Sequence, residues 1–312
     1  YNDVAIACVL FGVFYLVEIW SAERRAALLV PIGLLAGFAY AIKYTAFLAL
    51  PYALAAVAWR RWRARESVLR PVLVISGCAL LLIAPWVVKN WMWTGNPFSP
   101  FFNKWFPNPY VHVIFEQQYV EHMRHYDGIQ SYKQIPLEVT VHGARLCGLL
   151  GPLFLLAPLA LLALRRADGR RLLFAALVFS STYFSNIGTR FLIPAAPFVS
   201  LAMAMPVASV PGLPALLILA HGALSWPDIL KQYCTHYAWR LDRIVWKQAL
   251  RIESEESWLS RINPQYNIAR LLENNTPPEA RILSFNQVGE AYTSRTVLVL
   301  SLIHISEPTR PY

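Results

Sequence analysis

Long apolar runs, separated by short basic or polar stretches, dominate the first 226 residues of the chain. Several of these runs are shorter than the ~20 residues that an upright membrane span requires. About eight runs are predicted as membrane helices by their apolar composition, and they cover residues 4–20, 27–42, 45–59, 71–88, 146–164, 172–186, 191–205 and 207–226. The pattern predicts an all-α polytopic membrane protein.

A tryptophan-rich stretch ends the fourth run, and we expect it to surface at one face of a bilayer. Tryptophan favours the boundary between hydrocarbon and headgroups because its apolar ring carries one polar N–H. The breaker cluster at 94–97 then ends the helix. The polar loop that follows, residues 90–145, is too long for a simple connection, and long loops are usually functional. Within it, residues 111–123 are expected to form a short helix.

Arginine clusters mark every second connection between the apolar runs, at residues 24–25, 60–70 and 165–171. Positively charged loops remain on the cytoplasmic side of a membrane, so these connections are predicted to face inward. The connections at 43–44 and 187–190, and the long loop, then face outward together.

A change of pattern follows residue 226. Residues 227–299 contain helix-like stretches at 257–261 and 265–274, followed by strand-like stretches at 280–285 and 296–299. This order predicts the start of a small α/β domain on the outer side of the membrane.

The two ends of the chain differ from the rest. Residues 300–312 resemble the translation of a transposase-type sequencing adapter, so they are treated as a non-native tail and excluded from fold prediction. The chain begins at Tyr1 inside an apolar pattern, and we expect it to be an internal fragment of a longer protein.

Composition agrees with a membrane protein. Hydrophobic residues make up 56% of the 312 residues and charged residues 15%, whereas soluble proteins carry about 25% charged residues. The net charge of +10 comes from arginines between apolar runs, which is typical of membrane orientation and argues against a nucleic-acid partner. The four cysteines show neither metal-ligand spacing nor a disulfide framework.

Asp3 is the first candidate for chemistry, since acidic residues are scarce in the membrane part of the chain. A carboxylate at the outer mouth of a helix can act as a base or orient a sugar hydroxyl. The alternative is structural, because Asn2 or Asp3 also suits the N-cap of the first helix.

Three cations are predicted at the outer face: Lys43, Lys89 and Arg190. Lysine and arginine are expensive near hydrocarbon, and orientation rules disfavour them on this side. A lipid-linked phosphate bound by charge-assisted hydrogen bonds would explain them. The alternative for Lys43 is a snorkelling lysine that marks a tight hairpin.

The histidines of the long loop suggest a metal site only weakly. His122 and His125 are three residues apart beside Glu121, but no zinc signature is matched. A solvated interfacial helix is the preferred interpretation, and no metal ligand is predicted. The chain also lacks a Gly-rich phosphate loop and a nucleophile elbow.

Four stretches together resemble motifs of the bacterial GT-C superfamily of membrane glycosyltransferases. They are the hairpin Gly37 to Thr45 with Lys43 and Tyr44, the helix exit Pro85 to Pro97 with Lys89, Asn90, Thr94, Gly95 and Asn96, the stretch Thr189 to Pro194 with Arg190, and the acidic Tyr1-Asn2-Asp3. The superfamily includes protein mannosyltransferases, aminoarabinose transferases of lipid A and Rgt-type lipopolysaccharide glycosyltransferases. Residues 1–226 are therefore expected to form a GT-C-like membrane region.

The resemblance implies a multi-pass enzyme of the bacterial inner membrane whose active face is periplasmic. Such enzymes pass a sugar from a polyprenyl-phosphate donor to a lipid, glycan or protein acceptor. By resemblance, Lys43, Tyr44, Lys89 and Arg190 bind the donor phosphate, and Asp3 is a secondary acid. The leading catalytic acid would precede Tyr1, in which case the fragment itself is inactive. No cofactor is assigned, and the use of a divalent metal is left open.

Two other classes of function are weighed against this one. A transporter or lipid flippase would carry its polar site at mid-depth on broken helices, whereas the polar residues here gather at one face. A non-catalytic membrane scaffold that displays an outer domain is the third alternative.

Overall fold

The computed structural model describes residues 2–111, 113–126, 129–233, 246–284 and 288–299. The chain divides into two compact units, Tyr1–Tyr233 and Cys234–Tyr312. The described part is mostly helical, and its strands lie in the second unit.

Helices build the first unit, as the apolar runs predict. Stretches of 3₁₀-helix join several of them, notably Tyr44–Leu48, the 14-residue Pro152–Arg165 and Thr189–Ala195. The α-helices are α1 (Asn2–Glu23), α2 (Leu29–Ile42), α3 (Ala49–Arg63), α4 (Leu69–Thr94), α5 (Val113–His125), α6 (Ile135–Leu137), α7 (Ala167–Ser180), α8 (Ala196–Val207) and α9 (Leu213–Tyr233).

Three helices of the described chain are long and apolar enough to cross a membrane: Asn2–Glu23, Leu69–Thr94 and Thr189–Val207. They support the prediction of a membrane protein, but the predicted number of about eight spans is not supported. The other apolar runs form shorter helices, with 14 residues in α2 and 15 in α3. A 15-residue helix is about 22 Å long, which is short of a hydrocarbon core of about 30 Å.

The break between α2 and α3 has a local cause. Lys43 is extended (φ −164°, ψ 139°) and a 3₁₀ turn follows it, so neither helix continues through this point. The third of the long apolar helices, Thr189–Val207, consists of the 3₁₀ stretch Thr189–Ala195 followed by α8.

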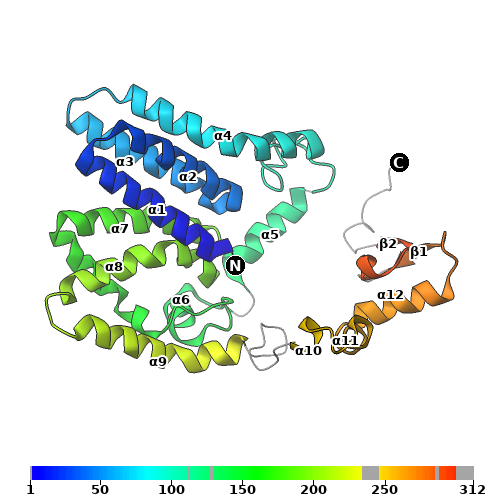
Figure 1. Cartoon of the computed structure of the whole chain (residues 1–312). Helices are drawn as coiled ribbons and strands as arrows, with labels where there is room; N and C mark the ends of the chain where they lie inside the picture. The colour runs from blue at the N-terminus through cyan, green and yellow to red at the C-terminus, as the bar shows by residue number, and fades with distance from the viewer. Residues whose placement is uncertain (1, 112, 127–128, 234–245, 285–287, 300–312) are drawn as a thin grey trace. The chain divides into compact units, whose positions relative to one another are not determined.

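α1 runs through the centre of the first unit, with α2 and α3 on one side and α7 and α8 on the other (Figure 1). Its buried face repeats every three or four residues, as one face of a helix requires. The buried apolar residues of α1 are Ile6, Ala7, Leu10, Val13, Phe14, Val17 and Trp20.

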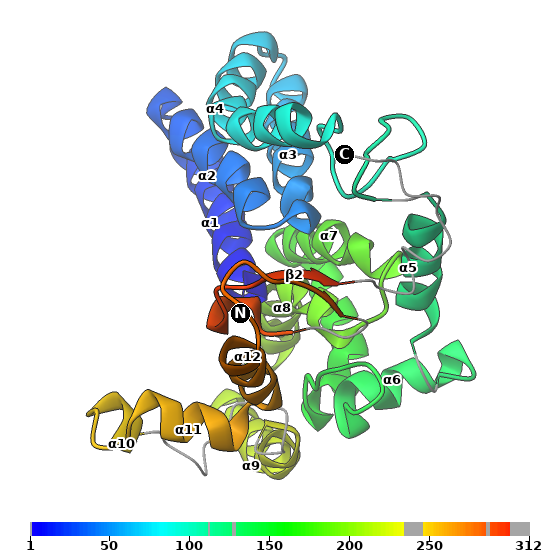
Figure 2. The same cartoon turned by 90° about the vertical axis from the view of Figure 1, so that its right-hand side faces the viewer.

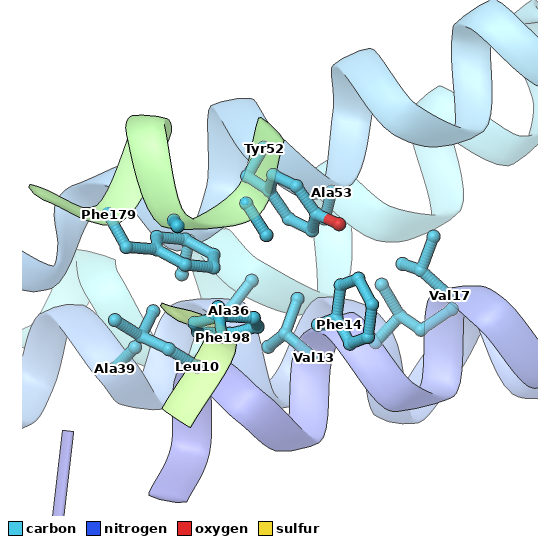
Figure 3. Close-up of a cluster of buried hydrophobic side chains, with 14 of the residues drawn as sticks. Leu10, Val13, Phe14, Val17, Ala36, Ala39, Tyr52, Ala53, Phe179 and Phe198 are labelled. Atoms are coloured by element: carbon cyan, nitrogen blue, oxygen red, sulfur yellow. The ribbon is translucent and has the colours of Figure 1, made fainter. Parts of the chain in front are cut away.

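Aromatic rings fill the core around that face (Figure 3). The Phe14 ring meets the Phe198 ring edge-on at 5.3 Å, and Phe198 lies 5.3 Å from Phe179. Phe179 in turn lies 4.9 Å from Tyr52. These contacts join α1, α3, α7 and α8 into one core.

Two glycines allow α2 and α4 to pack closely. A Cβ at Gly33 would lie 2.6 Å from the carbonyl oxygen of Ile75, and a Cβ at Gly37 would lie 2.4 Å from that of Ala79. Small residues four apart let helix backbones approach in this way. The Gly37 of the hairpin motif therefore has a packing role.

Replacing Gly37 by alanine should destabilise the first unit by about 1–3 kcal/mol, because the methyl group meets backbone that cannot move aside. Gly77→Ala is the matched control on α4, since a Cβ there meets nothing within 4 Å, and it should be neutral or stabilising by up to about 1 kcal/mol. Thermal unfolding in detergent measures both. Equal effects of the two substitutions would contradict the close packing.

The second unit contains α10 (Trp246–Ala249), α11 (Glu255–Ile262), α12 (Pro264–Asn275) and a two-stranded sheet. Ser254 caps α11 by accepting from the Ser257 N–H, and Asn263 caps α12. The strands β1 (Arg281–Ser284) and β2 (Thr296–Val299) pair in parallel. α11, α12 and both strands coincide with the helices and strands predicted from the sequence.

Glu273 ties the end of α12 to the turn before β2. Its carboxylate accepts from the Ser294 hydroxyl at 2.6 Å, the Thr293 hydroxyl at 2.7 Å and the Ser294 N–H at 2.9 Å. Arg295 lies 3.3 Å away. The Ser294 and Thr293 hydroxyls, ahead of the other contacts, lower the pKa of Glu273 from 4.5 to about 2.

The second unit should therefore lose stability in acid. A carboxylate with a lowered folded-state pKa stabilises the fold above its unfolded pKa, and this contribution disappears as the pH falls from about 4.5 towards 2. Hydrogen exchange of α12 and β2 amides between about pH 6 and pH 2 measures the loss. Glu273→Gln should flatten this dependence, whereas Glu279→Gln, at an exposed position before β1, should keep it. An unchanged profile in Glu273→Gln would contradict the assignment.

Candidate functional site

An aromatic cavity of about 640 Å³ lies beside the break between α2 and α3. Residues 40–47, the loop 98–102, α5 and residues 182–191 line it. α5 lies between the loop that follows α4 and the short helix α6 (Figure 2). The cavity therefore brings together segments that are up to about 150 residues apart in sequence, as tertiary sites do.

Asp3 and Lys43 form an ion pair next to this cavity. The Lys43 Nζ lies 2.6 Å from the Asp3 Oδ1, and the two side chains are 25% and 9% exposed. Asn2 and Asp3 lie in the first turn of α1, so neither stands before the helix as its cap. Lys43 is paired instead of snorkelling into solvent. The extended backbone of Lys43 aims its side chain at the start of α1.

Lys43 and Arg190 share one aromatic ring. The Lys43 Nζ lies 4.6 Å and the Arg190 Cζ 5.2 Å from the centroid of the Phe191 ring, and all three residues line the cavity. Cations over an aromatic face are stabilised by its quadrupole. Arg190 is exposed and has no acidic partner among the described residues. Its guanidinium is therefore available to an anion that enters the cavity.

Tyr44 and Asn90 connect the cavity to α4. The Asn90 side-chain amide donates to the Tyr44 hydroxyl at 2.8 Å. The Tyr44 ring also meets the rings of Tyr40 and Phe101 edge-on, at 5.5 and 6.2 Å. The predicted site residues Lys43, Tyr44 and Arg190 thus lie at one cavity, and Asn90 supports it.

The structure does not bring Lys89 to this cavity. Its ammonium lies 4.7 Å from the Trp93 ring and 5.3 Å from the Trp86 ring, on the exposed side of α4. Asn90, one residue later, points to Tyr44 because successive helix residues face about 100° apart. The Lys89 side chain therefore contacts the two tryptophans and does not line the cavity with Lys43 and Arg190.

Thr94, Gly95 and Asn96 shape the loop that forms one wall of the cavity. Gly95 ends α4 in the left-handed conformation (φ 69°), which glycine adopts at little cost. The buried Asn96 amide donates to the Phe101 carbonyl at 2.7 Å, and its oxygen accepts from the Phe98 N–H at 2.9 Å. These residues position Phe98 and Phe101, which line the cavity. Their role in the structure is to hold the loop.

Glu116 is a cavity residue that the sequence did not single out for this role. It lies in the first turn of α5 and accepts from the Asn103 side chain at 2.8 Å and from the N–H groups of Phe102 and Asn103. Burial raises the pKa of Glu116. The three hydrogen bonds together lower it by more than burial raises it, so the pKa lies below its usual value. No local pattern signals this contact, because its partners lie 13 and 14 residues away.

The other end of α5 is fixed close to Arg190. The Tyr126 hydroxyl donates to the buried Asn186 Oδ1 at 3.0 Å, and the Ile187 N–H donates to the Met123 carbonyl at 3.0 Å. Gly188 packs closely at this crossing, since a Cβ there would lie 2.4 Å from the Tyr126 hydroxyl oxygen. α5 is therefore anchored at both ends and forms a wall of the cavity.

The histidines of α5 are engaged within the helix and its neighbour. His125 Nδ1 lies 3.0 Å from the Glu121 carbonyl oxygen, and the His122 ring stacks on Tyr126 at 5.7 Å. Among the described residues, no three His, Cys, Asp or Glu side chains are grouped closely enough to hold a metal ion.

No protein-family model, curated protein or solved structure matches this chain.

The Asp3–Lys43 pair should be coupled energetically. A double-mutant cycle of Asp3→Asn and Lys43→Met, followed by thermal unfolding, should give a coupling energy of about 1.5–3 kcal/mol because the pair is largely desolvated. The exposed pair Glu23–Arg25, with side chains 45% and 65% exposed, is the control and should give about 0–1 kcal/mol. Similar small values for both pairs would contradict the structural role of Asp3.

Proposed function

We propose that the chain is part of an integral membrane glycosyltransferase. It transfers a sugar from a polyprenyl-phosphate donor to a lipid, glycan or protein acceptor on the outer face of the bacterial inner membrane. One observation carries the proposal: Lys43 and Arg190 flank Phe191 at an aromatic cavity, and Arg190 has no acidic partner among the described residues. Lys43 and Arg190 also belong to the stretches of sequence that resemble GT-C motifs.

The cavity suits a phosphate attached to a long apolar chain. Arginine offers a planar fork that matches two phosphate oxygens, and lysine supplies a point charge. The aromatic and apolar wall, with Phe47, Phe98 and Met123 among its residues, suits the hydrocarbon part of the carrier. A cavity with both properties favours a lipid-linked phosphate over a free sugar phosphate.

The proposed reaction is a direct displacement at the anomeric carbon. An acceptor hydroxyl attacks this carbon, the bond from carbon to phosphate oxygen breaks, and the electron pair remains on the phosphate. Arg190 and Lys43 stabilise the negative charge that develops there. The acceptor proton passes to a carboxylate acting as general base.

Asp3 is assigned a positioning role in this scheme. Its carboxylate is buried and lies 2.6 Å from Lys43, and it is absent from the residues that line the cavity. It therefore holds the lysine in place, and the general base is not assigned to it. This changes the role that the motif resemblance alone implies for Asp3.

The proposed orientation places the cavity towards the periplasm. Arg60 and Arg171 lie at the opposite end of α1, bound to Glu18. About 22 Å of helix separates Asp3 from Glu18 at a rise of 1.5 Å per residue. The positive-inside rule assigns the arginine-rich end to the cytoplasm. The shorter apolar helices would complete a multi-pass arrangement beside the three long ones.

The distribution of polar groups favours a transferase over a transporter or flippase. Carriers bind their cargo near mid-depth, where the first unit instead packs Val13, Phe14 and Phe198 in an apolar core. A purely scaffolding role would not require a cation without an acidic partner at an aromatic cavity.

Arg190→Gln and Lys43→Gln should each weaken binding of polyprenyl phosphate by about tenfold to a hundredfold, the loss expected for one charge-assisted hydrogen bond. Lys89→Gln is the matched comparison. It also removes one cation, at the end of α4 that precedes the cavity-lining loop, but Lys89 does not line the cavity. It should leave the affinity within about twofold of the parent, since no contact to the phosphate is lost.

Binding is measured on purified protein with polyprenyl phosphate and, separately, with the uncharged polyprenol. Parent affinity in both Arg190→Gln and Lys43→Gln, with the variants folded, would rule out the phosphate site. Equal binding of polyprenol and polyprenyl phosphate would do the same.

A further inference from the structure

A second cavity, at the other end of the first unit, is rich in arginine. It has a volume of about 730 Å³ and lies between α3 and α7. Five arginines line it together with Tyr52, Trp59 and Phe174; they are Arg24, Arg60, Arg63, Arg170 and Arg171. The proposed sugar-transfer site does not use any of these residues.

Two helix faces form the walls of this arginine cavity. On α3, the lining residues follow a three- and four-residue spacing from Tyr52 to Arg63. On α7 the same spacing runs from Ala167 to Phe174. Residues at this spacing share one side of a helix. Alanines among them leave a hollow between the larger side chains.

The arginines are only partly neutralised. Glu18 lies 2.6 Å from Arg171 and also pairs with Arg60. Asp168 pairs with Arg171 as well, and Glu66 lies 3.4 Å from Arg24. Arg63 and Arg170 have no acidic partner among the described residues. The Arg170 guanidinium donates to the Leu164 carbonyl at 3.0 Å, and the Arg63 guanidinium lies 5.9 Å from the Trp59 ring.

One of the five arginines occupies an unusual backbone position. Arg24 follows α1 in the left-handed conformation (φ 56°), where glycine is favoured. Its guanidinium lies 5.3 Å from the Trp20 ring. The chain thus adopts a disfavoured conformation at a residue whose side chain lines the cavity.

The remaining lining is apolar, so the cavity is polar at one end only. Tyr52, Ala55 and Phe174 lie farther from the arginine-rich ends of α3 and α7 than the arginines of these two helices do. Trp59, which is 56% exposed, stands beside the arginines. Tryptophan favours the headgroup region of a membrane. A ligand with an anionic head and an apolar body matches this arrangement better than a free anion does.

We propose that this arginine cavity binds the phosphate headgroup of an anionic phospholipid, with the start of its acyl chains against Tyr52 and Phe174. Basic pockets between membrane helices bind such headgroups. Arg63 and Arg170 supply the positive charge, because neither pairs with an acidic side chain among the described residues, whereas Glu18, Asp168 and Glu66 pair with the other three arginines. The site lies at the opposite end of α1 from Lys43 and Arg190, so the lipid is distinct from the proposed donor.

The test uses the purified, delipidated chain in neutral detergent. Phosphatidylglycerol is added to one set of samples, phosphatidylcholine to a second and inorganic phosphate to a third. Native mass spectrometry counts the bound lipids, and thermal unfolding follows stabilisation. Phosphatidylglycerol should bind and raise the melting temperature, whereas phosphatidylcholine and inorganic phosphate should bind at least about tenfold more weakly.

Two kinds of variant locate the binding. The double substitution Arg63→Gln with Arg170→Gln should weaken phosphatidylglycerol binding at least about tenfold, because two charge-assisted contacts are lost. Arg165→Gln with Arg166→Gln is the matched control, since it removes two exposed arginines next to α7 that do not line the cavity. Ala55→Phe keeps every charge but fills the hollow, and it should also weaken binding.

Parent-like binding of phosphatidylglycerol in both the Arg63/Arg170 double variant and Ala55→Phe would overturn the proposal. Equal binding of phosphatidylcholine would overturn the preference for an anionic lipid. Inorganic phosphate that binds as tightly as the lipid would show an anion site without lipid recognition, and would overturn the proposal as well. All three positions are exposed, and melting temperatures without lipid check that the variants are folded.

Discussion

Ion pairs at the two ends of α1 are the contacts on which the arrangement of the first unit depends. Asp3 pairs with Lys43 at one end, and Glu18 pairs with Arg60 and Arg171 at the other. Between them α1 buries an apolar face. A charge among apolar side chains is expensive unless it is paired. The segments that carry the partners, which are the link between α2 and α3 at one end and α3 and α7 at the other, are therefore aligned along α1 by two charged layers about 22 Å apart.

The same alignment separates two cavities with different chemistry. Near the Asp3 end lies an aromatic cavity. Lys43 is paired with Asp3 there, whereas Arg190 has no acidic partner among the described residues. Near the Glu18 end, a larger group of arginines exceeds the acids that bind it. The first cavity offers two cations on one aromatic ring, and the second offers a wide hollow lined by arginines. In our proposals, the first end holds a lipid-linked sugar donor and the second holds a membrane lipid.

Sequence pattern alone predicted the kind of element better than its length. The apolar runs became helices, and α5, α11, α12 and both strands lie where local patterning placed them. Span number could not be read in the same way, because the extended Lys43 and the 3₁₀ stretches shorten helices without a matching change in hydrophobicity. Residue period and apolar content do not report where a backbone leaves the α-helical conformation.

The site was predictable as a set of residue types but not as a set of contacts. Lys43 and Arg190 were identified by their cost near hydrocarbon and by motif resemblance, and Tyr44 by motif resemblance alone. All three lie at one cavity. Lys89 was identified on the same grounds, yet its side chain lies on the tryptophan side of α4. The pairing of Asp3 with Lys43 spans 40 residues, so no local signal could show it.

Cysteine labelling in intact cells tests whether the Lys43–Arg190 cavity and the arginine cavity lie on opposite sides of the membrane. The native cysteines are first replaced by alanine, and single cysteines are then placed at Gln130 and at Arg170. A thiol reagent that does not cross membranes should label Gln130→Cys in intact cells, and Arg170→Cys only after the cells are permeabilised. Labelling of both positions from the same side, or of Arg170→Cys alone in intact cells, would contradict the account.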